Sequence, residues 1–114
     1  MEIKYFLQNV KLTPRDKEIV EKKINKLNKY SVKILEAKLD LSFNDAHSKY
    51  EQFRVEVNLM LPNKLIRGEE RSANLQGGLD EVMDELERQL KKYKSKKETK
   101  RRRARRDAKE GKIS

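Results

Sequence analysis

The sequence contains no cysteine and a single histidine, which removes several kinds of chemistry at once. Without cysteine there is no disulfide framework, no thiolate metal site and no cysteine nucleophile. His47 stands in a polar stretch, with no second histidine and no neighbouring nucleophile, so we expect an exposed loop residue there rather than a catalytic base. The sequence therefore does not favour an enzyme, and we expect neither a cofactor nor a bound metal.

Long apolar runs are also missing. No uninterrupted run approaches the roughly 20 residues that span a bilayer, and residues 1–12 carry charged and amide side chains where a secretion signal has an apolar segment. We expect a soluble, cytoplasmic protein with no membrane partner and no small-molecule substrate. With 114 residues, 35% of them hydrophobic, the chain is long enough for one small core.

Charge is what the sequence has in excess, and it is concentrated at one end. The net charge is +10 at pH 7. Residues 91–114 carry 13 Lys or Arg and 3 Asp or Glu, whereas residues 1–90 carry 16 of each and are neutral. A run of like charges repels itself and buries no apolar area. We therefore expect a domain of residues 1–97 and a basic, flexible tail of residues 98–114 that binds phosphates by counterion release.

Alternation of apolar and polar residues predicts strands. The expected strands are residues 2–7, 35–43, 53–61 and a weaker 64–71. In the second strand, the residues expected on the buried face are Leu35, Ala37, Leu39, Leu41 and Phe43.

Apolar residues at helical spacing predict two helices. The first runs over about residues 14–29, with Thr13 as its cap and Pro14 in its first turn. The second carries an apolar stripe from Leu75 to Tyr93. Its cap is Ser72 or Asn74, and the two glycines that follow each cost about 1 kcal/mol relative to alanine.

The element order β-α-β-β-β-α predicts an α+β fold. The first β-α-β unit crosses over right-handed and pairs strands one and two in parallel, and the later strands pair antiparallel. Each strand has one apolar face and each helix one apolar stripe. We therefore expect a four-stranded sheet with both helices packed on one face.

Both predicted helices are acidic at their start and basic towards their end, an arrangement that also complements the helix dipole. Because both helices run from the same edge of the sheet, we expect their basic halves to lie side by side and to form, with the tail, a stripe that follows phosphates. The outward face of the sheet lacks an exposed aromatic pair for base stacking, which favours recognition of RNA backbone and shape.

Three stretches occur in an order and spacing that are characteristic of one family. They are the helix start Thr13-Pro14 with Lys26-Leu27-Asn28-Lys29-Tyr30, the alternating strand pair at 35–61, and Leu79-Asp80 followed by Leu86-Glu87-Arg88-Gln89-Leu90-Lys91-Lys92. Over about residues 1–97 the chain resembles the short form of the ribosome hibernation-promoting factor and ribosome-associated inhibitor A family. The resemblance implies a fold like that of double-stranded RNA-binding domains.

The resemblance also implies a function without catalysis. Such a protein is a ribosome hibernation factor that binds the small ribosomal subunit and its rRNA in the mRNA/tRNA channel, and sterically inhibits translation under stress or in stationary phase. This sequence shows no second, dimerising domain of the long form, so we expect no ribosome pairing by this chain alone, and we expect a monomer off the ribosome. The family's aspartate and tyrosine at the start of the last helix are replaced here by Asn74 and Gln76.

An alternative function stays open. Basic extensions on neutral domains are typical of structural ribosomal or ribosome-assembly proteins that bind RNA. A DNA-binding module is disfavoured, because no helix-turn-helix or zinc site is recognisable.

Basic residues in three segments are the candidates for RNA binding. On the two helices the resemblance points to Lys22, Lys23, Lys26, Lys29, Arg88, Lys91, Lys92 and Lys96. In the tail, an Arg-rich run unusual for the family adds Arg101, Arg102, Arg103, Arg105 and Arg106. Arg88 and Lys92 are the strongest candidates, because they fall in the matching Arg-Gln-Leu-x-Lys stretch.

Overall fold

The computed structural model describes the backbone of residues 1–113 and the side chains of residues 1–96. The elements along this part of the chain are β1 (Glu2–Gln8), α1 (Pro14–Asn25), the 3₁₀ helix η1 (Lys26–Tyr30), β2 (Glu36–Phe43), β3 (Phe53–Leu61), β4 (Lys64–Ser72) and α2 (Leu75–Ile113). This order confirms the predicted β-α-β-β-β-α arrangement. The last turns of the first predicted helix are the 3₁₀ segment.

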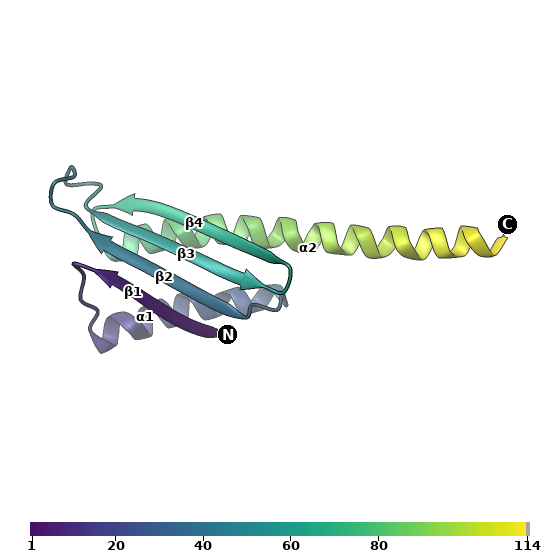
Figure 1. Ribbon diagram of the computed structural model, residues 1–114, viewed down its shortest axis with the longest axis horizontal. Coiled ribbons are helices and arrows are strands. Elements are labelled where there is room, and N and C mark those ends of the chain that lie inside the picture. Colours follow the sequence, from purple (N-terminus) through teal and green to yellow (C-terminus); the bar gives the residue numbers. More distant parts are fainter. Residues whose placement is uncertain (114) are drawn as a thin grey trace.

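The four strands form one sheet in the order β1-β2-β3-β4. β1 pairs with β2 in parallel, and the remaining neighbours are antiparallel. Both helices lie on the same face of the sheet and run in the same direction, while the opposite face is left without a helix (Figure 1). The predicted α+β class and the layer arrangement are therefore confirmed.

The core lies between the sheet and the two helices. Alternate residues of β2 and β3 are buried against it, and α2 contributes its predicted stripe, including Leu79, Leu86 and Leu90, all fully buried. The expectation that Leu35 points inward is wrong, because its side chain is 47% exposed. β2 begins only at Glu36, and Ile34 in the preceding connection is buried instead.

Side-chain caps fix where both helices begin. The Asp16 N–H donates to Thr13 Oγ1 at 3.1 Å and the Thr13 N–H donates to Asp16 Oδ2 at 3.0 Å, a reciprocal capping box. The hydrogen bonds from Thr13 hold the pKa of Asp16 below its ordinary value. For α2, the Gly77 N–H donates to Asn74 Oδ1 at 2.7 Å. Of the two predicted caps, Ser72 and Asn74, it is therefore Asn74 that caps this helix.

The last helix is much longer than the strands beside it, since α2 has 39 residues and the longest strands have 9. Its backbone stays helical to Ile113, and it continues well past the end of the sheet (Figure 1). The predicted boundary between residues 97 and 98 falls inside this helix, and the division of the chain there stays a prediction. No helix in the part of the chain that the structure describes is long and apolar enough to cross a membrane.

Gly78 is required where α2 starts to pack on the sheet. A Cβ atom at this position would lie 2.9 Å from Cγ2 of Val55, a fully buried and stiff side chain, and 3.3 Å from Cβ of Ser72. We expect Gly78→Ala to lower the free energy of unfolding by about 1 kcal/mol, because a clash of ~1–3 kcal/mol exceeds the gain of about 1 kcal/mol in helix propensity.

Denaturant unfolding measures this difference. The control is Gln76→Ala, an exposed site in the same turn, which we expect to change stability by less than about 0.5 kcal/mol. A Gly78→Ala variant more stable than the parent would show that α2 does not pack this closely on β3.

Candidate RNA-binding surface

Ion pairs join α1 and η1 to the first half of α2. Lys23 Nζ pairs with Asp80, and Lys29 Nζ lies 3.2 Å from Glu87 Oε1. The hydrogen bond and charge of Glu87 raise the pKa of Lys29, which stays cationic. Two of the four candidates in the first predicted helix are therefore paired with carboxylates of α2, and their contacts with RNA stay a prediction.

These pairs also fix the register between the helices. The basic half of the first predicted helix lies beside the acidic first turns of α2, so the expectation that the two basic halves lie side by side is wrong. The acidic residues of α2 precede its basic residues in the sequence and lie beside α1 and η1. Their carboxylates are there close enough to attract Lys23 and Lys29. The basic residues of α2 begin with Arg88, directly after Glu87.

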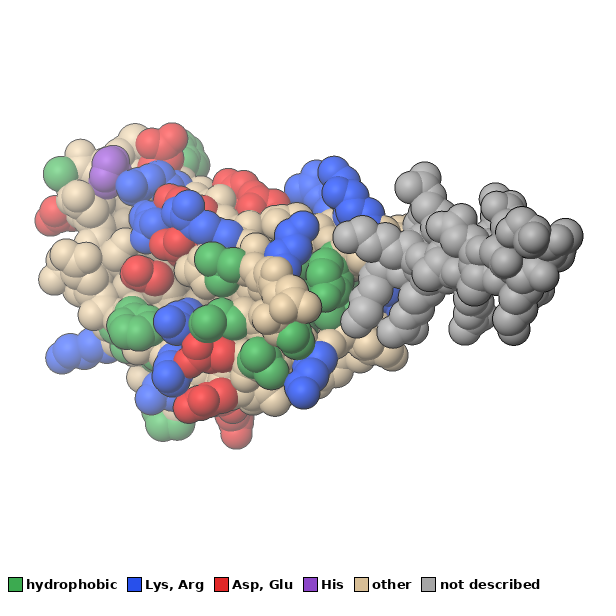
Figure 2. Space-filling model, turned by 45° about the vertical axis from the view of Figure 1, so that its right-hand side comes forward, with side chains coloured by type: hydrophobic (Ala, Val, Ile, Leu, Met, Phe, Trp, Pro, Cys, Tyr) green, Lys and Arg blue, Asp and Glu red, His purple; other side chains and the backbone are tan. Residues whose placement is uncertain are grey.

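The other lysine candidates in the described part of the chain are exposed and make no ion pair or side-chain hydrogen bond there. They are Lys22, Lys26, Lys91, Lys92 and Lys96. Three of them follow one another along α2 as it passes the end of the sheet. Figure 2 shows basic side chains on the body at this end, next to the undescribed grey atoms.

Arg88 is in a different position from these lysines. Its side chain is exposed, and its Nε donates a long hydrogen bond of 3.4 Å to the Asp84 carbonyl oxygen one turn earlier. Arg88 also lies close enough to Glu70 for its charge to act on that carboxyl group. Part of the positive charge of Arg88 is therefore compensated within the protein.

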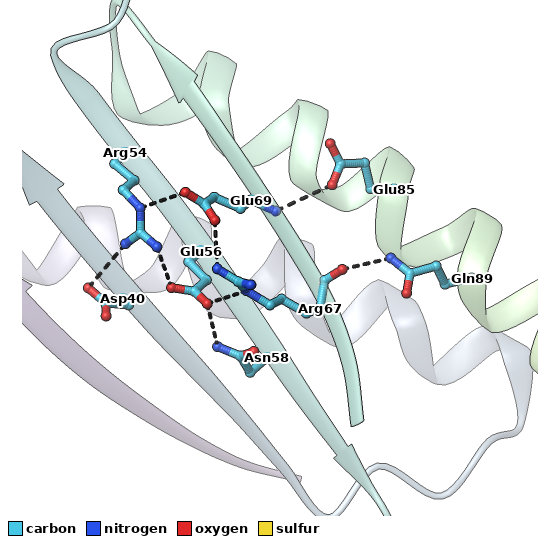
Figure 3. Close-up of polar contacts among 8 residues, drawn as sticks. All are labelled: Asp40, Arg54, Glu56, Asn58, Arg67, Glu69, Glu85 and Gln89. Carbon is cyan, nitrogen blue, oxygen red and sulfur yellow. Dashed lines mark hydrogen bonds and ion pairs between the residues drawn. The ribbon is translucent and has the colours of Figure 1, made fainter. Parts of the chain in front are cut away.

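Carboxyl groups meet where α2 crosses β4. The hydrogen bond between Glu70 and Glu85, together with partial burial and the charge of Glu85, raises the pKa of Glu70, although a hydrogen bond with Glu81 and the charge of Arg88 act in the opposite sense. Glu85 Oε2 also accepts the Glu69 N–H at 3.3 Å, and Gln89 Nε2 donates to the Arg67 carbonyl oxygen at 2.7 Å (Figure 3). These side chains of α2 satisfy outward-pointing backbone groups of an edge strand.

The open face of the sheet is covered by a compensated charge network (Figure 3). Arg54 lies 2.7 Å from both Glu56 and Glu69, and its Nη1 lies 3.9 Å from Asp40. Arg67 pairs with the same two glutamates. Burial raises the pKa of Glu56, but the hydrogen bonds that it accepts outweigh this and lower it overall. With three carboxylates for two guanidinium groups, this network does not make the face basic.

The tail candidates Arg101, Arg102, Arg103, Arg105 and Arg106 lie beyond residue 96, outside the described side chains. Their part in RNA binding stays a prediction. The same holds for the eight helix candidates, whose positions are now known but whose contacts with RNA are not tested by this structure.

Comparison with known proteins identifies the family. The family model described as Sigma 54 modulation protein / S30EA ribosomal protein matches residues 3–98. The chain belongs to this family. A curated relative, the ribosome hibernation promotion factor of Deinococcus radiodurans, is 35% identical over 74 residues, which are 65% of this chain. They are 39% of that relative, so the match spans well under half of its length.

Solved structures of S30EA-like proteins have the same fold. The Protein Y N-terminal domain of Thermus thermophilus superposes with a TM-score of 0.71 at 34% identity, covering 82% of this chain and 99% of that domain. A ribosomal subunit interface protein from Coxiella burnetii gives a TM-score of 0.68 at 27% identity, covering 83% of this chain and 99% of that one. The sequence resemblance is thus confirmed at the level of family and fold.

The sequence alone did not predict which side chains make contacts across the candidate RNA-binding surface. The pairing of Lys23 and Lys29 with α2 depends on the register of two helices separated by three strands, which no local pattern contains. The contacts of Glu85 and Gln89 with the β4 edge were missed for the same reason. The only available signal was the acidic start of the last helix, which complements the helix dipole and by itself does not indicate a partner on another helix.

The raised pKa of Glu70 gives a pH-dependent prediction. A carboxyl group whose pKa is higher in the folded state favours folding less when it ionises, so stability is lost as pH rises through the folded-state pKa. We expect Glu70→Gln to be more stable than the parent at pH 7. The difference should disappear as pH falls below the ordinary value of 4.5, where both states are protonated.

Urea unfolding across this pH range tests the sign of the effect. Asp45→Asn removes a carboxylate from an exposed loop position that does not line the hollow around Glu70, and it serves as the control, with no gain in stability expected at neutral pH. A Glu70→Gln variant that is less stable than the parent at neutral pH would contradict the arrangement of Glu70 and Glu85.

Proposed function

We propose that this chain is a ribosome hibernation factor. It binds the small ribosomal subunit and its rRNA in the mRNA/tRNA channel, and inhibits translation sterically under stress or in stationary phase. Membership of the S30EA family supports a ribosome-associated role, as do the names of the Deinococcus radiodurans and Coxiella burnetii relatives. The protein acts in the cytoplasm, as a monomer off the ribosome and without a cofactor.

The observation that carries this proposal is the row of exposed lysines on α2 where it leaves the sheet, which make no ion pair with any side chain of residues 1–96. Lys91, Lys92 and Lys96 lie on one rigid helix whose apolar stripe anchors it to the core. Residues 1–90 behind them have no net charge, and some of their charged side chains, such as Lys23, Lys29 and Arg54, are paired with carboxylates. A protein of this kind binds phosphates through one end, and its body then blocks the space that it occupies.

The register of the helices ranks the candidate contacts. Lys91, Lys92 and Lys96 are the first choice, and Lys22 and Lys26 on α1 the second, because none of the five is held by a carboxylate in the described part of the chain. Lys23 and Lys29 position the helix pair. The Arg-rich segment that follows residue 97 acts as an added anchor along the RNA.

Charge reversal of the α2 lysines tests the binding surface. We expect Lys91→Glu with Lys92→Glu to weaken binding to vacant small subunits by about tenfold or more, because each lost phosphate contact removes counterion release and adds repulsion. Both side chains are exposed, so the fold should remain intact by circular dichroism and denaturation.

The matched control is Lys11→Glu with Lys49→Glu. These exposed residues lie in the loops at the opposite end of the sheet, and the double change alters net charge by the same amount. We expect it to bind nearly as the parent does. Equal loss of binding by both double variants would mean that overall charge, and not the α2 surface, determines binding.

Function itself is tested by co-sedimentation with vacant ribosomes at low and high salt, with and without residues 98–114, alongside cell-free translation. We expect salt-sensitive binding to the small subunit, inhibition of translation, and weaker binding after truncation. Binding without any effect on translation would favour the structural or ribosome-assembly role. No binding to vacant ribosomes would contradict the proposed function.

A further inference from the structure

A polar pocket of about 250 Å³ lies at the end of the sheet opposite to the basic part of α2. Its lining residues come from the ends of β1, β2 and β4, from the residue after β1 and from the loop between β2 and β3. These strand ends and this loop lie together at one end of the sheet (Figure 1). Its polar walls are Gln8, Asn9, Ser42, Asn44, His47 and Arg71, and Phe43 adds an aromatic side chain. These residues belong neither to the hydrophobic core nor to the proposed RNA-binding surface, so their clustering is not explained by either.

Arg71 is the cation of this pocket, and it differs from the other arginines on the same face. Arg54 and Arg67 are each held by at least two carboxylates, whereas Arg71 makes no ion pair or side-chain hydrogen bond within the described part of the chain. No carboxylate lines the pocket either. Arg71 also lines a second, more open hollow with Glu51, Glu69 and Glu70, although it makes no ion pair with them. On the side of the pocket its exposed guanidinium group lies beside neutral polar side chains, where it suits a phosphate that it can bind through two parallel hydrogen bonds.

The amide side chains supply a second kind of recognition. Gln8, Asn9 and Asn44 each carry both a donor and an acceptor, the combination that reads the edge of a nucleobase. Asn44 Oδ1 accepts the Ala46 N–H at 2.9 Å, which orients the side chain and leaves its NH₂ group free to donate.

Backbone geometry brings Asn9 into this wall. Asn9 has a φ of 57°, in the left-handed region that asparagine tolerates better than most residues. This conformation turns the chain away from β1 immediately after Gln8. The amides of Gln8 and Asn9 therefore line the same pocket instead of continuing along the strand.

We propose that this pocket binds a single nucleoside monophosphate unit. Its phosphate lies on Arg71, with His47 alongside, and its base edge meets the amides of Gln8, Asn9 and Asn44. The volume is below the roughly 300–1,000 Å³ of pockets that enclose drug-sized ligands, so the ligand is one nucleotide and not a longer segment. The unit comes from a free nucleotide or from an unpaired residue of RNA, and the pocket does not rest on the proposed ribosomal function.

Titration of the ¹⁵N-labelled full chain with each of the four ribonucleoside 5′-monophosphates, and with inorganic phosphate, tests the proposal. We expect saturable chemical-shift changes at the amides of Asn9, Asn44 and His47 with at least one nucleotide, and weaker binding of phosphate alone. Arg71→Ala should weaken nucleotide binding about tenfold or more, since it removes a charge-assisted hydrogen bond. Gln8→Ala should change the preference among the four bases.

Lys49→Ala is the matched control. It removes a positive charge from the loop between β2 and β3, which also carries Asn44 and His47, but Lys49 itself does not line the pocket. It should bind nucleotide as the parent does. Absence of a saturable shift at the pocket residues with all four nucleotides overturns the proposal, as does equal weakening by Arg71→Ala and Lys49→Ala.

Binding of Arg71→Ala to vacant small subunits then identifies the source of the nucleotide. Weaker binding than the parent assigns the pocket to an RNA residue, and unchanged binding assigns it to a free nucleotide. The titration uses the protein alone, so a failure of the ribosomal proposal leaves its result unaffected.

Discussion

The packing of the α2 stripe against the sheet is the interaction on which the rest of the structure depends. Leu79, Leu86 and Leu90 are fully buried, so removing one of them to alanine costs about 2–5 kcal/mol. This packing fixes the axis of α2 over several turns. Because a helix is stiff, the same contacts also set the direction in which the helix and its basic residues leave the body.

The part of the chain that precedes the basic residues at the end of α2, residues 1–90, has no net charge. The first turns of α2 are acidic and pair with Lys23 and Lys29 of the preceding helices, and the open face of the sheet carries its own paired network. Exposed pairs of this kind add little stability, typically less than about 1 kcal/mol each. Their consequence lies in the proposed binding, because among residues 1–96 they leave the α2 lysines without a carboxylate partner and so as the proposed phosphate-binding surface.

The elements and the layer arrangement could be predicted because they depend on local patterns. Strand alternation, the Thr13 cap and the stripe from Leu75 to Tyr93 are all contained in short stretches of sequence, and the handedness rule then restricts the topology. Leu35 was misplaced because strand periodicity does not show where pairing begins.

The candidate site was only partly predictable, because electrostatics depends on which residues meet in three dimensions. The sequence shows that Lys22, Lys23, Lys26 and Lys29 are basic, but not that two of the four face carboxylates. The pocket at the far end gathers residues from three strands and two connecting segments, and its residues do not form a motif along the chain. Positions of this kind become visible only when the fold is known.

The most direct test of this account is a cryo-electron microscopy structure of the full chain bound to a vacant small ribosomal subunit. The account predicts α2 lying against rRNA from Lys91 onwards, with the body in the mRNA channel and Lys23 and Lys29 still paired to α2. A complex in which the open face of the sheet contacts the RNA, while the end of α2 points into solvent, would contradict it.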